Sequence, residues 1–90
     1  MNHLSIKVSG KVQGVFFRAS TKDMADEIGI KGFVRNESDG SVYIEAEADD
    51  ERLNEFIAWC HHGPSHAVVE NVQVEKGGSI QNFTKFEVRR

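Results

Sequence analysis

Apolar and polar residues alternate along residues 4–9 and 42–48, and in two longer stretches apolar residues recur at helical spacing. Three further short segments are also expected to be strands. Alternation with a period of two is typical of a half-buried strand, whereas recurrence every three or four residues is typical of an amphipathic helix. The pattern predicts two helices and five strands in the order β-α-β-β-α-β-β, with the strands at about residues 4–9, 32–36, 42–48, 69–75 and 84–88. This order predicts an α+β fold with an antiparallel sheet and two helices on one face.

Residues that favour helix ends and turns support these boundaries. The first helix is expected from about Arg18 to Ile28, because Gly29 suits the left-handed conformation that commonly ends a helix. Asp39-Gly40 predicts the turn of a hairpin. Asp49 or Asp50 can cap the second helix, which Gly63-Pro64 would stop. The buried stripe of that helix is predicted to be Leu53, Phe56, Ile57 and Cys60.

Length and composition indicate a single soluble domain over residues 1–90. The chain is 39% hydrophobic and 28% charged, which is typical of a globular protein rather than a disordered one. It contains no apolar run of membrane-spanning length, and the first residues do not form a secretory signal. The single cysteine, Cys60, cannot form an intramolecular disulfide, so a reducing cytoplasm is the expected location.

The net charge of −3 is unevenly divided along the chain. Residues 1–36 hold six Lys or Arg against three acidic residues, whereas residues 37–90 hold five against eleven. The positive excess of the first part favours a small anion as ligand, while a nucleic acid would need a broad basic face with stacking aromatic residues.

The segment from Gly10 to Arg18 joins the first strand to the first helix and suits an anion. The first N–H groups of a helix have no internal partner and carry partial positive charge, so they can hold an oxyanion together. Gly10 and Gly14 permit positive φ angles and close backbone approach, and Arg18 adds a planar fork of donors for two phosphate oxygens. Val15-Phe16 stands where a nucleotide P-loop has Lys and Ser or Thr, so a small phosphoryl group is expected. Spacing alone is equally compatible with an ordinary strand-to-helix connection and a solvated Arg18.

Asn36 is a second candidate, at the end of the strand that follows the first helix. An Asn before a turn commonly satisfies local backbone groups, which is the simpler interpretation. In a β-α-β arrangement, however, this strand can lie near the first one, so Asn36 could face the Arg18 loop. Its amide could then orient a water molecule by donating one hydrogen bond and accepting another.

Four further groups of residues favour structural interpretations. His61, His62 and His66 lack the ligand spacing of a metal site, because Gly63-Pro64 interrupts any helical face that they share. Cys60 is expected to be a buried small apolar residue, and Trp59 a partly buried helix residue. The acidic residues Asp49, Asp50 and Glu51 suit the first turn of a helix. No metal and no cofactor is therefore expected.

Two segments closely resemble the signatures of the acylphosphatase family. The first is Val8 to Arg18, with the sequence VSGKVQGVFFR, and the second is Gly32 to Val42, with the sequence GFVRNESDGSV. The likeness extends over essentially the whole chain, including Gly63-Pro64. It departs from the family pattern at Ala48, where glycine is usual, at Val68, where arginine is frequent, and at the terminal Arg89-Arg90, where a tyrosine is common.

The resemblance implies a ferredoxin-like two-layer sandwich and a small metal-free hydrolase of acyl phosphates. A monomer without a nucleic acid or membrane partner is expected. By this resemblance, Arg18 and Asn36 are the catalytic residues, with Asn36 positioning water. The phosphate is expected at the loop amides and the Arg18 side chain, within the substrate-binding set Gln13, Gly14, Val15, Phe16, Phe17 and Arg18.

Two other functions stay open on the sequence. The same fold can serve as a non-catalytic anion- or RNA-binding module, although the acidic net charge and the absence of paired exposed aromatic residues on a predicted strand argue against RNA. Related modules also precede zinc-binding and carbamoyl-transfer segments in hydrogenase maturation proteins. The chain contains no such segments, and an apparently complete start and end favour a free-standing enzyme.

Overall fold

The structure is a computed structural model that describes residues 1–90, and it confirms the predicted order of elements. The elements are β1 (Asn2–Lys11), α1 (Phe17–Ile28), β2 (Lys31–Asn36), β3 (Val42–Ala48), α2 (Asp50–Cys60), β4 (Val68–Lys76) and β5 (Phe86–Val88). Each strand and helix lies within a few residues of its predicted position. The last strand is shorter than expected, since it begins at Phe86 rather than near Thr84.

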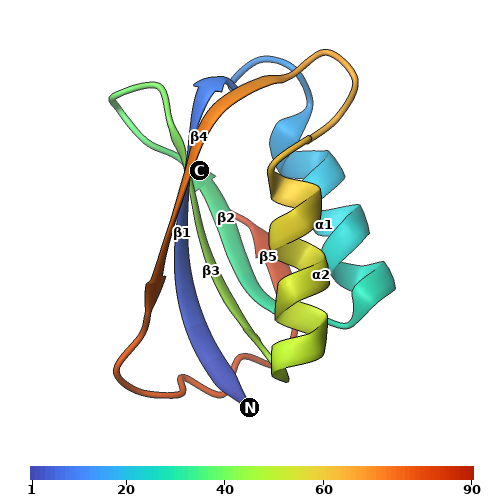
Figure 1. Cartoon of the computed structure of the whole chain (residues 1–90), viewed down its shortest axis with the longest axis vertical. Coiled ribbons are helices and arrows are strands. Elements are labelled where there is room, and N and C mark those ends of the chain that lie inside the picture. Colours follow the sequence, from blue (N-terminus) through green and yellow to red (C-terminus); the bar gives the residue numbers. More distant parts are fainter.

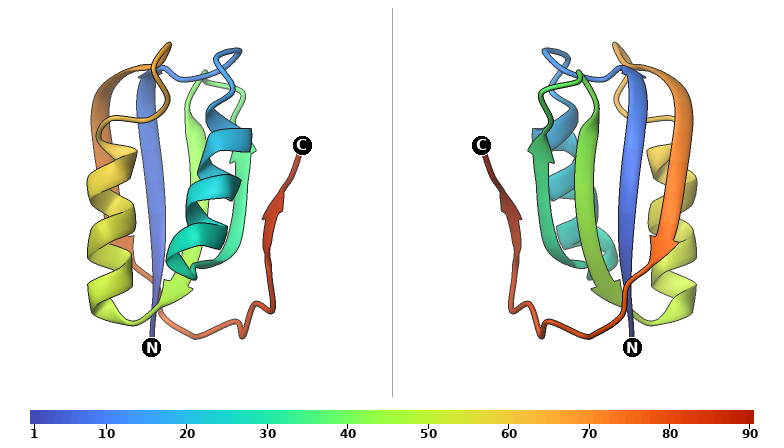
Figure 2. Two further views of the ribbon diagram at one scale, coloured as in Figure 1. Left: turned by 90° about the vertical axis from the view of Figure 1, so that its right-hand side faces the viewer. Right: turned by 90° about the vertical axis from the view of Figure 1, so that its left-hand side faces the viewer.

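The strands form one sheet in the order β4-β1-β3-β2-β5, with both helices on the same face (Figure 1). The ferredoxin-like sandwich is thus confirmed, with one refinement to the expected antiparallel sheet. Three strand pairs are antiparallel, but β5 runs parallel to β2. The chain leaves β4 at one edge, crosses the bottom of the sheet and reaches the opposite edge, as Figure 2 shows, so β5 runs in the same direction as β2.

The core lies between the helices and the face of the sheet that they cover. Alternate residues of the central strands point toward it, and Ile6, Val8, Val42 and Ile44 are fully buried. The predicted stripe of α2 meets them, with Leu53, Phe56 and Cys60 buried and Ile57 packed at the edge of the core. Burial of this apolar surface is the main stabilising contribution to the fold.

The predicted helix ends are also found. Gly29 ends α1 with φ 98°, and its N–H donates to the carbonyl oxygen of Ala25 at 2.8 Å. Asp49 is the N-cap of α2, where a carboxylate oxygen accepts a hydrogen bond from Arg52 N–H at 2.9 Å. Neither helix has the length and apolar character needed to cross a bilayer.

A buried carboxylate on the open side of the sheet holds the connection between β4 and β5. Glu47 is 2% exposed and accepts hydrogen bonds from the N–H groups of Gln81 and Phe83 and from Nδ1 of His3. Glu45 approaches the other ring nitrogen of His3 at 3.0 Å. Glu47 thus fixes the connection at Gln81 and Phe83, and the ladder with β2 begins at Phe86.

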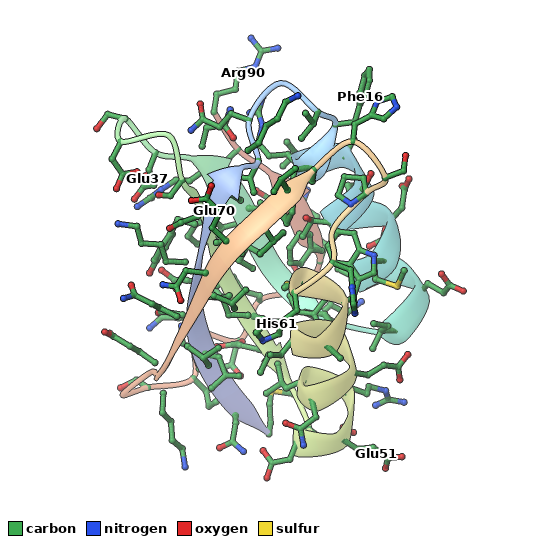
Figure 3. The ribbon with its side chains drawn as sticks, turned by 45° about the horizontal axis from the view of Figure 1, so that its top comes forward. Phe16, Glu37, Glu51, His61, Glu70 and Arg90 are labelled. Carbon is green, nitrogen blue, oxygen red and sulfur yellow. The ribbon has the colours of Figure 1, made fainter.

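The candidate residues collect at one end of the molecule. The loop after β1, the β2–β3 turn and the carboxyl terminus all lie at the upper end of Figure 1, opposite the amino terminus. Figure 3 shows Phe16, Glu37 and Arg90 at this end. Segments that are far apart in the sequence can therefore contribute to one site.

Candidate active site

The loop of residues 12–16 leaves β1 through an irregularity in the sheet. The register between β1 and β4 shifts between Ser9 and Gly10, and Gly10 has φ 125°. A β-carbon at this position would overlap the backbone of β4 at Val68 and Glu70. Glycine is required here because β4 approaches so closely, and the shift directs the chain away from the sheet and toward α1.

Gln13 ties this loop to the β2–β3 turn. Its Nε2 donates hydrogen bonds to the carbonyl oxygens of Glu37 at 2.8 Å and Ser41 at 2.9 Å. The side chain thus faces the hairpin and does not line the cavity described below. A substrate contact by Gln13 therefore remains a prediction that concerns its backbone N–H.

The backbone donors of the loop are free. None of the N–H groups from Gln13 to Ala19 donates a hydrogen bond within the protein. Phe16 occupies the N-cap position of α1 and provides no side-chain acceptor, and the first turn of the helix contains no acidic residue. The start of α1 therefore presents unpaired donors and the positive end of the helix dipole, as an anion site requires.

Arg18 lies in the first turn of α1, next to these donors. Its Nη1 donates a hydrogen bond to the carbonyl oxygen of Arg89 at 3.1 Å. None of the ion pairs in the structure involves Arg18. The guanidinium is thus oriented by a neutral acceptor and keeps its charge and further N–H donors for an anion.

Asn36 ends β2 and faces the same region, as the β-α-β arrangement suggested. Its Oδ1 is buried and has no hydrogen-bond partner in the protein. Every other buried side-chain oxygen or nitrogen has such a partner. A buried polar atom without a partner is costly, so such atoms commonly mark functional positions.

Arg18 and Asn36 line one cavity of about 310 Å³. Its wall is formed by Val12, Gly14, Phe16, Phe17, Arg18, Ala19, Asn36 and Val88. The structure therefore brings together most of the predicted site residues. Val15 is outside this wall, because its side chain is buried in the core. The wall includes no carboxylate or imidazole group that could hold a divalent cation.

Three wall residues were not among the sequence predictions. Val12 and Ala19 flank the predicted substrate-binding set of residues 13–18 and could have been included from their neighbourhood alone. Val88 belongs to β5, and it reaches the cavity because β5 pairs with β2 in parallel. No sequence signal identified that pairing.

The residues given structural interpretations have structural surroundings. Burial raises the pKa of the Cys60 thiol to about 12, so the reactive thiolate form is disfavoured. The ring of Trp59 packs against those of Phe17 and Phe56. His61, His62 and His66 are exposed, and they belong to no group of three potential metal ligands.

Comparisons with known proteins identify the family to which the chain is similar. A sequence model of the acylphosphatase family matches residues 4–88. The chain is 46% identical over 86 residues to the acylphosphatase of Marinobacter nauticus, covering 96% of this chain and 94% of that protein.

Solved structures give the same result. The crystal structure of the Bacillus subtilis acylphosphatase superposes with a TM-score of 0.97 at 31% identity and covers 100% of both chains. Full-length HypF, in its phosphate- and nucleotide-bound form, has a TM-score of 0.91 at 29% identity over 99% of this chain, which corresponds to 12% of that protein. The family model spans nearly the whole chain, and by this match the protein belongs to the acylphosphatase family.

Proposed function

We propose that this acylphosphatase hydrolyses the carboxyl–phosphate bond of its substrate in the Arg18–Asn36 cavity. The observation that carries the proposal is the meeting of three features at one site. They are a run of unpaired loop N–H groups, a guanidinium outside any ion pair, and a buried amide oxygen without a partner. The phosphate of the substrate binds the loop amides and Arg18, and Asn36 positions the attacking water.

The reaction needs little beyond this arrangement. The water oxygen attacks phosphorus, the bond from phosphorus to the acyl oxygen breaks, and the carboxylate leaves with the bonding electrons. A carboxylate is a good leaving group, so no acid is needed to protonate it. A phosphoryl oxygen takes the proton of the water. Catalysis then depends on positioning and on stabilising the charge of the equatorial oxygens, which Arg18 and the loop amides supply.

Asn36 has a distinct part in this mechanism. The amide can accept a hydrogen bond from water through Oδ1 while Nδ2 donates to another group. The water would then lie across the cavity from the start of α1, facing phosphorus. This assigns the unpartnered Oδ1 a partner during the reaction.

The first experiment measures hydrolysis of acetyl phosphate, benzoyl phosphate and a phosphate monoester in the presence of a chelator. We expect turnover of both acyl phosphates and much slower turnover of the monoester, whose alkoxide is a poor leaving group. Preference for the monoester, or activity that requires added metal, would contradict the proposal.

Two variants separate the roles of the residues. Arg18→Gln should remove both turnover and competitive inhibition by inorganic phosphate. Asn36→Ala should reduce kcat by about 10²–10³, the usual effect of losing one preorganised polar group, while phosphate still inhibits. Wild-type turnover by Arg18→Gln would show that the guanidinium is not required.

The partners and location follow from the same proposal. The ligands are a small acyl phosphate and inorganic phosphate, with no metal, nucleic acid or membrane partner, and the domain over residues 1–90 acts as a monomer in the cytoplasm. The single cysteine supports a reducing location, and the cavity of about 310 Å³ suits a small ligand. Binding of RNA that falls steeply with salt concentration would instead favour a nucleic-acid module.

A further inference from the structure

Phe16 combines two unfavourable features at the lip of the cavity. Its backbone is left-handed, with φ 64° and ψ 22°, and its side chain is 78% exposed. The left-handed conformation costs a residue with a β-carbon roughly 1–2 kcal/mol. An exposed ring recovers little of this cost through burial, and Figure 3 shows that Phe16 projects outward from the loop. The stability of the fold therefore does not explain a phenylalanine at this position.

The N-cap position explains only in part why residue 16 is a phenylalanine. Ser, Thr, Asp or Asn at an N-cap normally accepts a hydrogen bond from an N–H of the first turn. Such a side chain at position 16 would use donors that the phosphate needs. An apolar residue avoids this competition, but alanine would avoid it equally well, so the large ring requires another reason.

The cavity has a polar part and an exposed apolar part. Arg18, Asn36 and the loop backbone form the polar part, whereas Val12 and Phe17 contribute apolar wall but are only 1% exposed. Phe16 and Val88 are the large apolar wall residues that are exposed, with exposed fractions of 78% and 43%. They come from the loop and from β5, so apolar surface reaches the mouth from two elements.

We propose that Phe16, with Val88, contacts the acyl group of the substrate and favours large apolar or aromatic acyl groups over small ones. This inference rests on the proposed function, which places the phosphate in the polar part. The remainder of the substrate must then leave the cavity past its mouth. An aromatic acyl group can pack against the Phe16 ring there, whereas an acetyl group is too small to cover it.

The test compares benzoyl phosphate with acetyl phosphate in the wild type and in Phe16→Ala. Alanine keeps the β-carbon, so it retains the backbone cost, and it cannot cap the helix. We expect the ratio of kcat/KM for benzoyl phosphate to that for acetyl phosphate to fall by about tenfold, the lower range for loss of an apolar contact. Val88→Ala should lower the ratio less, and Phe16→Leu should retain most of it.

Two controls distinguish the possible outcomes. Ile80→Ala truncates a 38% exposed apolar residue outside the cavity and should leave the ratio unchanged. The inhibition constant of inorganic phosphate reports whether the polar part is intact in Phe16→Ala. An unchanged ratio, or parallel loss of both substrates and of phosphate inhibition, would overturn the inference while the wild type remains an acylphosphatase. A wild type that hydrolyses neither acyl phosphate would instead refute the proposed function.

Discussion

Nη1 of Arg18, in the first turn of α1, donates a hydrogen bond to the carbonyl oxygen of Arg89, just beyond the end of β5, at 3.1 Å. The backbone N–H of Arg89 in turn donates to the carbonyl oxygen of Val34 in β2 at 2.8 Å. The guanidinium is therefore oriented by a segment that is itself fixed to the sheet. A neutral carbonyl can orient the guanidinium without neutralising the charge that binds phosphate.

Ending the chain after Arg89 tests the importance of that neutrality. The Arg89 carbonyl would become part of a carboxylate that can form an ion pair with Arg18. We expect phosphate inhibition to weaken about fivefold, which corresponds to the roughly 1 kcal/mol that an exposed ion pair contributes at most. The Arg90→Ala variant is the matched control, because it removes the same side chain but keeps the peptide bond. Equal inhibition constants for the two proteins would show that the neutrality of the Arg89 carbonyl is unimportant for phosphate binding.

Gln13→Ala should loosen the loop without removing a wall residue of the cavity. The variant loses both hydrogen bonds to the carbonyl oxygens of Glu37 and Ser41, at about 0.5–1.5 kcal/mol each. We expect the free energy of unfolding to fall by about 1–3 kcal/mol and phosphate inhibition to weaken. Chemical denaturation and inhibition assays measure the two effects. Gln73→Ala, which removes an exposed side chain that forms no hydrogen bond, should change neither, and the same result for Gln13→Ala would contradict the tethering role.

Gly10→Ala and Gly14→Ala should differ in their effect on stability. Both residues have positive φ angles, 125° and 74°, but a β-carbon at Gly10 would overlap the backbone of β4 while one at Gly14 meets no atom within 4 Å. We expect Gly14→Ala to cost roughly 1–2 kcal/mol through its backbone conformation. Gly10→Ala should cost about 3 kcal/mol or more, because overpacking adds to that penalty. Equal losses in thermal unfolding would show that the close approach to β4 is unimportant.

Local sequence patterns predicted most of the fold, because most elements here depend on local properties. Gly29 and Asp49 end and begin helices through contacts within four residues. Gly29 was predicted from sequence, and Asp49 was one of the two predicted caps. The parallel pairing of β5 was not predicted, because its direction depends on the path of residues 77–85 across the sheet. That path is held by Glu47, through contacts with residues 34 and 36 positions away. Contacts at such separations leave no periodic signal.

The candidate site was predictable where its residues lie close together in the sequence. The Gly10–Arg18 segment contains its own turn and helix start, so its donors could be inferred from sequence. The prediction for Asn36 needed a topological argument, and the structure places it in the same cavity as Arg18. The role of Gln13 as a tether was not anticipated, since its acceptors are carbonyl oxygens of the β2–β3 turn, and backbone acceptors are independent of residue type.

The Glu47 carboxylate should make folding stability depend on pH. Burial alone would raise its pKa, but hydrogen bonds from Gln81 N–H, His3 and Phe83 N–H outweigh that effect and hold the pKa below its ordinary value of 4.5. His3 is the titratable side chain that contacts Glu47 directly, and Glu45 contacts the other ring nitrogen of His3. A carboxyl group with a lowered pKa in the folded state stabilises the protein above the unfolded pKa. This contribution should be lost as the pH falls from about 4.5 through the lower folded value.

Glu47→Gln should therefore flatten this part of the pH profile. At pH 7 we expect it to lower the free energy of unfolding by about 1–3 kcal/mol, because an amide NH₂ faces donors that the carboxylate accepted. The difference from wild type should shrink as the pH falls below 4.5 through the lowered folded pKa of Glu47, because the wild-type carboxyl then also becomes protonated. Glu75→Gln, at an exposed position whose side chain forms no hydrogen bond or ion pair, should stay within about 0.5 kcal/mol of wild type at every pH. Parallel profiles for wild type and Glu47→Gln in denaturant titrations would mean that Glu47 carries no pH-dependent stability, and that the 77–85 connection is held by its apolar contacts instead.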